Sequence, residues 1–377
     1  MIVSTPPMGW NSWNTFGENI SEELLMEAAD AIVSTGLKDA GYEYVVIDDC
    51  WSLRERDADG KIVADPAKFP HGIKYLADYI HSKGLKFGMY SCAGTQTCAG
   101  YPGSFNHEFT DAQMFADFGV DFLKYDFCFK PRLAQGPMLY NKMGMALRAT
   151  GRDILYSACN WGSDDVWSWI RSTGAHMYRS TGDLGDNFKL MRDIGYSQIS
   201  KQAFNAPNCF NDPDMLIVGM YNQGNVGWGG CTDSEYLMHF SLWCMMSAPL
   251  MIGCDIRNMN EQTLALLTNK ELLAIDQDPA VRQVSRVPSD KGEDHLVLFK
   301  HLEDGDYAIA MYNFSEERRT DTFFLHDIGL GSETGYGLSM QNILNKEEKY
   351  DKVTDDFRCA LDAHACAIYR AKVIPLK

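Results

Sequence analysis

The stretch DFLKYDFCFK, residues 121–130, has the apolar density of a buried β-strand, yet it carries a lysine and an aspartate near its end. Removing a charge from water is costly, so Lys124 and Asp126 are unusual residues for a buried strand. Because they are two residues apart, their side chains point to the same face of a strand. We therefore expect the strand to end in a functional site, with Tyr125 facing the opposite layer.

The same order of apolar run, polar cluster and helix-like stretch repeats between residues 42 and 254. Strands that alternate with helices in this way pair in parallel, and eight of them predict a closed α/β barrel, the (β/α)8 or TIM-barrel class. The runs are MGWNSW, YEYVVIDD, LKFGMYS, DFLKYD, DILYSACN, HMYRSTGD, FNDPDML and APLMIGCD. The helical spacing of apolar residues covers residues 21–38, 71–83, 111–118, 139–150, 188–199 and 234–246.

The pattern of apolar and polar residues changes after residue 281. Short alternating apolar runs follow, separated by Gly, Asp, Ser and Glu, which is typical of antiparallel sheets. The sequence therefore predicts a barrel over residues 1–281 and a smaller C-terminal antiparallel β-sandwich over residues 282–377. The runs of the second domain are HLVLFKHL, DYAIAMYNF, RTDTFFLHDI and CAIYRAKVI.

The composition excludes several classes of partner. The 377 residues include 34 Lys and Arg against 51 Asp and Glu, a formal net charge of −17. This negative field repels nucleic acids and anionic membranes, so we expect neither as a partner. The longest uncharged apolar run, residues 243–254, is shorter than the roughly 20 residues of a membrane-spanning helix. Without paired CxxC motifs, clustered histidines or glycine-rich phosphate loops, we expect no metal and no cofactor.

Polar residues gather where the predicted strands end, on the face that carries the active site in barrel enzymes. Two carboxylates there can cleave a glycosidic bond, and we assign Asp126 as nucleophile and Asp183 as proton donor. In retaining enzymes such groups lie ~5–5.5 Å apart, which we expect here. Asp48 and Asp49 suit adjacent sugar hydroxyl groups, because carboxylates accept several hydrogen bonds. The other strand-end residues are Lys124, Asn160, Arg179, Asp212 and Asp214.

Two further groups complete the predicted pocket. The ammonium group of Lys124 is expected to keep the neighbouring Asp126 ionised, as a nucleophile requires. Tryptophans are expected to provide aromatic walls for a sugar ring. The candidates are Trp10, Trp13, Trp51 and Trp161, and about half of them are expected to fill the core instead.

Longer motifs in the chain resemble those of glycoside hydrolase family 27, the retaining α-galactosidases and α-N-acetylgalactosaminidases. The motifs are MGWNSW, GYEYVVIDDCW, DPAKFPHGIKYLADYIHSKGLKFGMYS, TCAGYPGS, FADFGVDFLKYDFC and NDPDMLIVG, in order between residues 8 and 279. The resemblance implies a (β/α)8 barrel followed by an antiparallel β domain, in agreement with the residue pattern. It also implies a substrate that ends in galactose, either an oligosaccharide or a glycoconjugate.

The resemblance implies a role for each matching residue. Asp126 would form the covalent galactosyl intermediate, and Asp183 would be the acid/base. Asp48 and Asp49 would bind the 6- and 4-hydroxyl groups of galactose. The other implied sugar-binding residues are Trp13, Tyr90, Cys98, Lys124, Arg179, Asp214 and Met215.

One departure from the family pattern bears on specificity. The chain reads CNW where α-galactosidases commonly read CEW, which puts Asn160 at the residue that touches the substituent on carbon 2. An amide can bond a 2-hydroxyl group, whereas N-acetylgalactosaminidases place small residues there to admit the acetamide. A β-L-arabinopyranosidase would replace Asp48 with an apolar residue, because its sugar lacks the 6-hydroxymethyl group.

We therefore predict a retaining exo-α-galactosidase. An α-N-acetylgalactosaminidase and a β-L-arabinopyranosidase are the alternatives within the family. A non-catalytic galactoside-binding protein is a further alternative, which the presence of both Asp126 and Asp183 disfavours.

The cysteines bear on location. The resemblance implies one disulfide, between Cys98 and Cys128 beside the site. Cys50 and Cys159 lack the partners that they have in secreted relatives, which favours a reducing, cytoplasmic location. The residues before Lys38 lack the basic region of a secretory signal, which also favours the cytoplasm. The alternative is secretion, or export to the periplasm, with the signal segment already removed. The sequence leaves open whether the chain forms a homo-oligomer.

Overall fold

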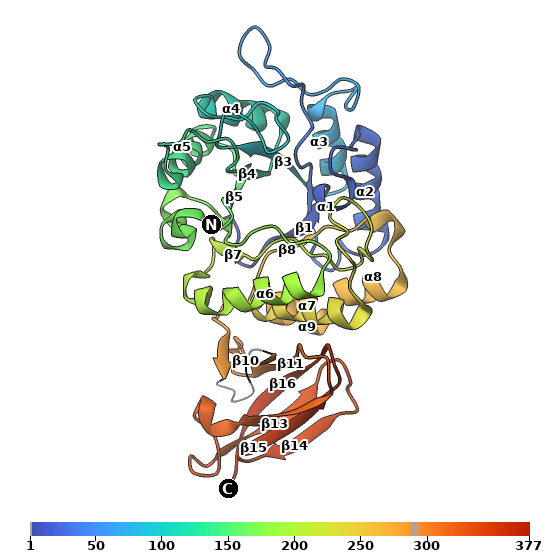
Figure 1. The fold of residues 1–377 in the computed structure, drawn as a ribbon, viewed down its shortest axis with the longest axis vertical. Coiled ribbons are helices and arrows are strands. Elements are labelled where there is room, and N and C mark those ends of the chain that lie inside the picture. Colours follow the sequence, from blue (N-terminus) through green and yellow to red (C-terminus); the bar gives the residue numbers. More distant parts are fainter. Residues whose placement is uncertain (1, 288–291, 293) are drawn as a thin grey trace.

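The computed structural model describes residues 2–287, 292 and 294–377. Its larger part is an eight-stranded parallel sheet in the order β7-β6-β5-β4-β3-β2-β1-β8, curled into a ring and surrounded by helices (Figure 1). A parallel bridge joins Leu216, just after β7, to Ile252 of β8, so the two edge strands meet. The predicted (β/α)8 barrel is confirmed.

Each barrel strand lies within a predicted apolar run, except that β3 extends one residue beyond its run, to Cys92. β4 covers Phe122–Asp126, and Asp126 is therefore the last residue of its strand. The parallel register of β3 and β4 places Tyr90 beside Lys124 and Cys92 beside Asp126, so the strand ends are level. The other strands are β1 (Met8–Asn11), β2 (Tyr44–Val46), β3 (Lys86–Cys92), β5 (Leu155–Cys159), β6 (Met177–Arg179), β7 (Phe210–Asp212) and β8 (Leu250–Ile252).

Several helices begin at a side chain that caps their first turn. Ser21 caps α2 (Glu22–Ser34) by accepting a 3.2 Å hydrogen bond from the backbone N–H of Leu24. A Thr232–Glu235 capping box opens α7 (Asp233–Met245). The remaining helices are α1 (Trp13–Phe16), α3 (Ile73–Ser82), α4 (Glu108–Phe118), α5 (Gly136–Ala149), α6 (Phe188–Gln198), α8 (Glu261–Leu267) and α9 (Lys270–Asp276). Between β5 and β6 the chain forms two 3₁₀ helices, Ser163–Ser168 and Ile170–Thr173, in place of an α-helix.

Alternation along the strands separates two apolar layers. Phe122 of β4 packs inside the barrel with residues from the other strands, including Val46, Leu155 and Phe210. Tyr125 faces outward into the larger core under the helices, as predicted. Lys124 and Asp126 follow Phe122 at intervals of two, so they point inward above this apolar plug.

The C-terminal part is the predicted antiparallel β domain. A six-stranded sheet has the order β14-β13-β16-β11-β10-β9, and β12 pairs with β15. Its strands are β9 (Ser285–Val287), β10 (His295–His301), β11 (Tyr307–Asn313), β12 (Arg319–Phe324), β13 (Tyr336–Asn342), β14 (Lys349–Val353), β15 (Asp356–Leu361) and β16 (Ala365–Pro375). The proposed boundary after residue 281 lies between α9 and β9. Helices long and apolar enough to cross a membrane are absent from the described ranges.

A buried lysine connects the two domains. Lys300 of β10 is fully buried, and its ammonium group donates to Ser247 Oγ at 2.5 Å and to the Ile275 carbonyl at 2.8 Å. Ser247 follows α7 and Ile275 belongs to α9, so one side chain ties the β domain to two barrel segments.

The first strand pair leaves no room for a side chain at Gly9. A Cβ atom there would lie 2.5 Å from the Tyr44 carbonyl oxygen. We expect Gly9→Ala to lower the free energy of unfolding by ~1–3 kcal/mol through overpacking, measured by urea denaturation. Gly182→Ala is the matched control, because a Cβ there meets nothing within 4 Å. Equal midpoints for the two variants would contradict this packing.

Candidate active site

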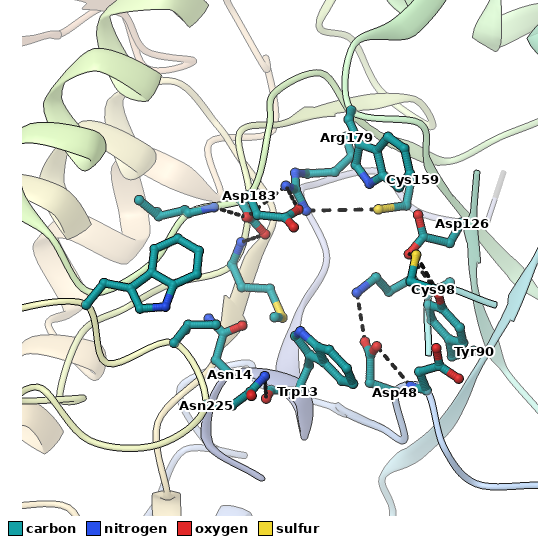
Figure 2. A pocket seen from close by; sticks show the side chains of 18 residues that line it. Trp13, Asn14, Asp48, Tyr90, Cys98, Asp126, Cys159, Arg179, Asp183 and Asn225 are labelled. Atoms are coloured by element: carbon teal, nitrogen blue, oxygen red, sulfur yellow. Dashed lines mark hydrogen bonds and ion pairs between the residues drawn. The ribbon is translucent and has the colours of Figure 1, made fainter. Parts of the chain in front are cut away.

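The carboxyl-terminal ends of the barrel strands surround a pocket of about 290 Å³ (Figure 2). This volume lies near the lower end of the ~300–1,000 Å³ range of ligand sites, which suits a small ligand. All of the residues assigned above to catalysis or to galactose binding line it, except Asn160. They are Trp13, Asp48, Asp49, Tyr90, Cys98, Lys124, Asp126, Arg179, Asp183, Asp214 and Met215.

The ionic partner of Lys124 is Asp48. Their Nζ and Oδ2 atoms lie 2.8 Å apart, and the side chains are only 15% and 3% exposed. Asn11 donates a second hydrogen bond to the same oxygen of Asp48, at 2.7 Å. The ammonium group of Lys124 therefore pairs with Asp48, and it acts on Asp126 through its charge.

Asp126 is buried and held by two donors. The Tyr90 hydroxyl group donates to Oδ2 at 2.8 Å, and the Phe127 backbone N–H donates to Oδ1 at 2.9 Å. Burial raises the pKa of Asp126 to about 6, although the Lys124 charge and the Tyr90 hydrogen bond both act to lower it. Lys124 thus favours the carboxylate as predicted, but desolvation outweighs its effect.

Arg179 links two acids of the pocket. Its Nη2 atom lies 2.8 Å from Asp183 Oδ1 and 2.9 Å from Asp214 Oδ2. The Asp183 side chain is 71% exposed, whereas that of Asp214 is buried. Backbone N–H groups of Leu184 and Met215 donate to Asp214 at 2.6 and 2.7 Å. Asp214 has a φ of 105°, a strained conformation of the kind that clusters at functional sites.

Asp49 is fixed by the loop that carries the disulfide. Its carboxylate accepts hydrogen bonds from the backbone N–H groups of Cys50, at 2.7 Å, and Ala99, at 3.0 Å. Burial raises the pKa of Asp49. The expected Cys98–Cys128 disulfide is present, and Cys98 Sγ lies 3.5 Å from Asp126 Oδ2. The disulfide therefore holds this loop against both carboxylates.

Cys50 and Cys159 form no disulfide, as their missing partners predicted, and both thiols are buried. The other free cysteines of the described ranges are also buried, except Cys366, which is half-buried.

Three predicted residues lie elsewhere. Asn160 is fully buried and donates to the Ser163 carbonyl at 2.8 Å, and the neighbouring Cys159 lines the pocket instead. Trp10 and Trp51 are core residues, in line with the expectation that about half of the four tryptophans fill the core. Their indole N–H groups donate to the backbone carbonyls of Cys254 and Tyr90. Trp13 and Trp161 do line the pocket.

Asp212 lies beneath the pocket. Its Oδ1 atom accepts the backbone N–H of Asp214 at 2.9 Å, and burial raises its pKa to about 6.

The loop between β7 and α7 brings residues that the sequence reasoning missed. The stretch YNQGNVGWGG, residues 221–230, is rich in glycine and carries one tryptophan, which were the available signals. Neither signal places a loop over a particular strand end. The missed lining residues are Asn14, Leu184, Asn225, Val226 and Trp228, together with Cys159.

The pocket contains carboxylates and cations, which together can bind the hydroxyl groups of a sugar and cleave a glycosidic bond. Among the lining residues of the described chain, five carboxylates face the two cations Lys124 and Arg179. One group of potential metal ligands occurs in the described ranges, formed by Cys98, Asp126 and Cys128. The two sulfur atoms are joined to each other, so they cannot act as thiolate ligands.

Comparisons with known proteins give a consistent result. Residues 5–278 match the family model of alpha galactosidase A, and residues 292–371 match that of the alpha galactosidase C-terminal beta sandwich domain. The Arabidopsis thaliana protein alpha-galactosidase 3 is 44% identical over 370 residues, which cover 98% of this chain and 82% of that protein.

Two solved structures superpose over nearly the whole chain. The Saccharomyces cerevisiae alpha-galactosidase with raffinose has a TM-score of 0.86 at 30% identity and covers 98% of both chains. A β-L-arabinopyranosidase of Geobacillus stearothermophilus has a TM-score of 0.86 at 25% identity, over 98% of this chain and 97% of that chain.

The buried Lys124–Asp48 pair offers a test of the pocket's electrostatics. Replacing Lys124 with Met leaves the Asp48 carboxylate buried, with the Asn11 amide as its side-chain donor among the described residues. We expect Lys124→Met to reduce the free energy of unfolding by ~3 kcal/mol, measured by urea denaturation at pH 7. The double variant with Asp48→Asn should recover part of this loss, because the unpaired charge is gone. Additive losses would show that the pair is not coupled.

Proposed function

The chain belongs to glycoside hydrolase family 27, the α-galactosidase family, and on this premise we propose that it cleaves terminal α-galactosyl residues with Asp126 as nucleophile and Asp183 as acid/base. The observation that carries the proposal is that both carboxylates line one small pocket, Asp126 at the end of β4 and Asp183 in the segment that follows β6. The substrate class is a galactose-terminated oligosaccharide or glycoconjugate, in line with the raffinose named for the yeast structure.

The hydrogen-bond donors and acceptors of the pocket side chains suggest how galactose binds. Asp48 and Asp49 are acceptors for the 6- and 4-hydroxyl groups, while Lys124 donates to the 3-hydroxyl side. Arg179 and Asp214 supply a donor and an acceptor near the 2-hydroxyl group. Every one of these side chains has a hydrogen-bond or ionic partner within the protein, so the protein itself holds them in position for the sugar.

The first step breaks the glycosidic bond. An oxygen of the Asp126 carboxylate attacks carbon 1 of galactose, and the bond from carbon 1 to the glycosidic oxygen breaks. Protonated Asp183 gives its proton to that oxygen, which leaves as an alcohol. The products of this step are a galactosyl ester of Asp126 and ionised Asp183.

The second step restores the enzyme. Asp183 removes a proton from water while the water oxygen attacks carbon 1, and the ester bond to Asp126 breaks. Asp126 returns as a carboxylate, Asp183 is protonated again, and galactose leaves with its original anomeric configuration. One water molecule is consumed for each glycosidic bond.

The pKa of Asp126 sets the acid limit of this mechanism. The nucleophile must be ionised, so kcat/KM should fall below pH about 6. Tyr90→Phe removes a hydrogen bond to the charged carboxylate, which raises its pKa. We expect the acid limb of the kcat/KM profile to move up by about one pH unit, equivalent to ~1.4 kcal/mol. Tyr178→Phe, with a buried hydroxyl outside the pocket, should leave the limb in place. A limb unmoved by Tyr90→Phe would contradict the role of Asp126.

Sugar specificity is tested with three nitrophenyl glycosides: the α-galactoside, the α-N-acetylgalactosaminide and the β-L-arabinopyranoside. We expect the α-galactoside to have the highest kcat/KM. Because Asp48 would bind the 6-hydroxyl group, Asp48→Ile should shift the kcat/KM ratio at least ~tenfold toward the arabinopyranoside. An unchanged ratio would remove Asp48 from this role. A preference for the acetamido sugar would show that the region near Asn160 and Cys159 admits a larger group.

A further inference from the structure

Part of the pocket is not used by the galactose ring in the arrangement above. Figure 2 shows Asn14 and Asn225 beside Trp13, on the side away from Asp48 and Tyr90. The residues of this second region come from α1, from the segment after Asp183 and from the β7–α7 loop. They are Asn14, Leu184, Asn225, Val226 and Trp228.

Trp228 is an aromatic residue of this region. Its indole packs on the backbone of Gly185, where an added Cβ would lie 2.1 Å from the indole Cε3 atom. Trp228 is nevertheless 49% exposed, which is unusual for so large an apolar side chain. Gly185 comes two residues after Asp183, so the indole lies beside the proposed acid/base.

The loop that carries Trp228 is held by a fully buried aspartate, Asp186. Its carboxylate accepts the backbone N–H of Asn222 at 2.7 Å and the hydroxyl group of Tyr236 at 2.9 Å. Its own backbone N–H donates to the Val226 carbonyl at 2.9 Å, and its carbonyl accepts the Gly230 N–H at 2.8 Å. The segment after Asp183 and the loop are therefore bonded to each other on both sides of Trp228.

The loop is also bonded to the opposite wall. The backbone N–H groups of Asn225 and Val226 donate to the carbonyls of Thr15 and Asn14, each at 3.1 Å. Trp228 is thus fixed before any ligand binds, which lowers the entropic cost of using it as a contact.

We propose that Trp228 is the platform of a leaving-group subsite that stacks a second sugar ring, with Asn225 available to its hydroxyl groups. The inference rests on the proposed function, because Asp183 must donate to the glycosidic oxygen and the leaving group is the other substituent of that oxygen. A leaving sugar attached to the glycosidic oxygen lies on the Asp183 side of the pocket, where the exposed indole of Trp228 is. Aromatic faces bury the apolar face of a ring while leaving its polar edge wet.

The test compares galactose release from three substrates that share the same galactosyl group: raffinose, melibiose and methyl α-galactoside. The methyl group is too small to reach a second subsite. We expect Trp228→Ala to lower kcat/KM about tenfold for raffinose and melibiose, equivalent to ~1.4 kcal/mol, and less than about twofold for the methyl glycoside. Trp228→Phe should restore most of the loss. Phe109→Ala, which removes a half-exposed aromatic ring on α4 outside the pocket, is the matched control.

Each other outcome overturns the inference. Equal losses on all three substrates would mean that Trp228 acts on the galactose ring or on the loop fold. Unchanged rates for Trp228→Ala would mean that the indole does not contact the leaving group. A wild-type protein that releases no galactose from any of the three would instead refute the proposed function, so the two failures are distinguishable.

Discussion

The active-site face depends on the pairing of charges that the barrel has removed from water. Five carboxylates and two cations share a pocket of about 290 Å³, and such groups are stable there only with partners. Lys124 neutralises Asp48, and Arg179 bridges Asp183 and Asp214. Parallel strands make this possible, because their level ends bring residues that are far apart in sequence to one face.

Asp126 differs in its surroundings from the three carboxylates of the pocket that pair with a cation, Asp48, Asp183 and Asp214. Its hydrogen-bond partners are the Tyr90 hydroxyl group and the Phe127 N–H, neither of which carries a charge. Burial therefore keeps its pKa near 6, far above that of an exposed aspartate, and its negative charge is not cancelled by direct contact with a cation. A carboxylate held in this way is available to attack, whereas Asp48 and Asp214, which are bound to cations, are suited to positioning a ligand.

The sequence was sufficient for the barrel and for most of the site because both depend on short-range patterns. The inward direction of Lys124 and Asp126 follows from strand alternation alone. The last residue of β5 decides whether Cys159 or Asn160 reaches the pocket. An apolar run in the sequence does not define the end of a strand to within one residue. Trp228 was missed because hydrogen bonds to Asp186, over 40 residues earlier in the chain, decide its position.

The most direct test of the account is to identify the residue that becomes covalently attached to the sugar. A fluorinated galactosyl fluoride, which slows hydrolysis of the ester intermediate, should label the protein once, and peptide mass spectrometry should place the galactosyl group on Asp126. Asp126→Asn should take up no label. A label on Asp183 or another carboxylate, or an unlabelled enzyme that still turns over the reagent, would contradict the assignment of Asp126 as the nucleophile.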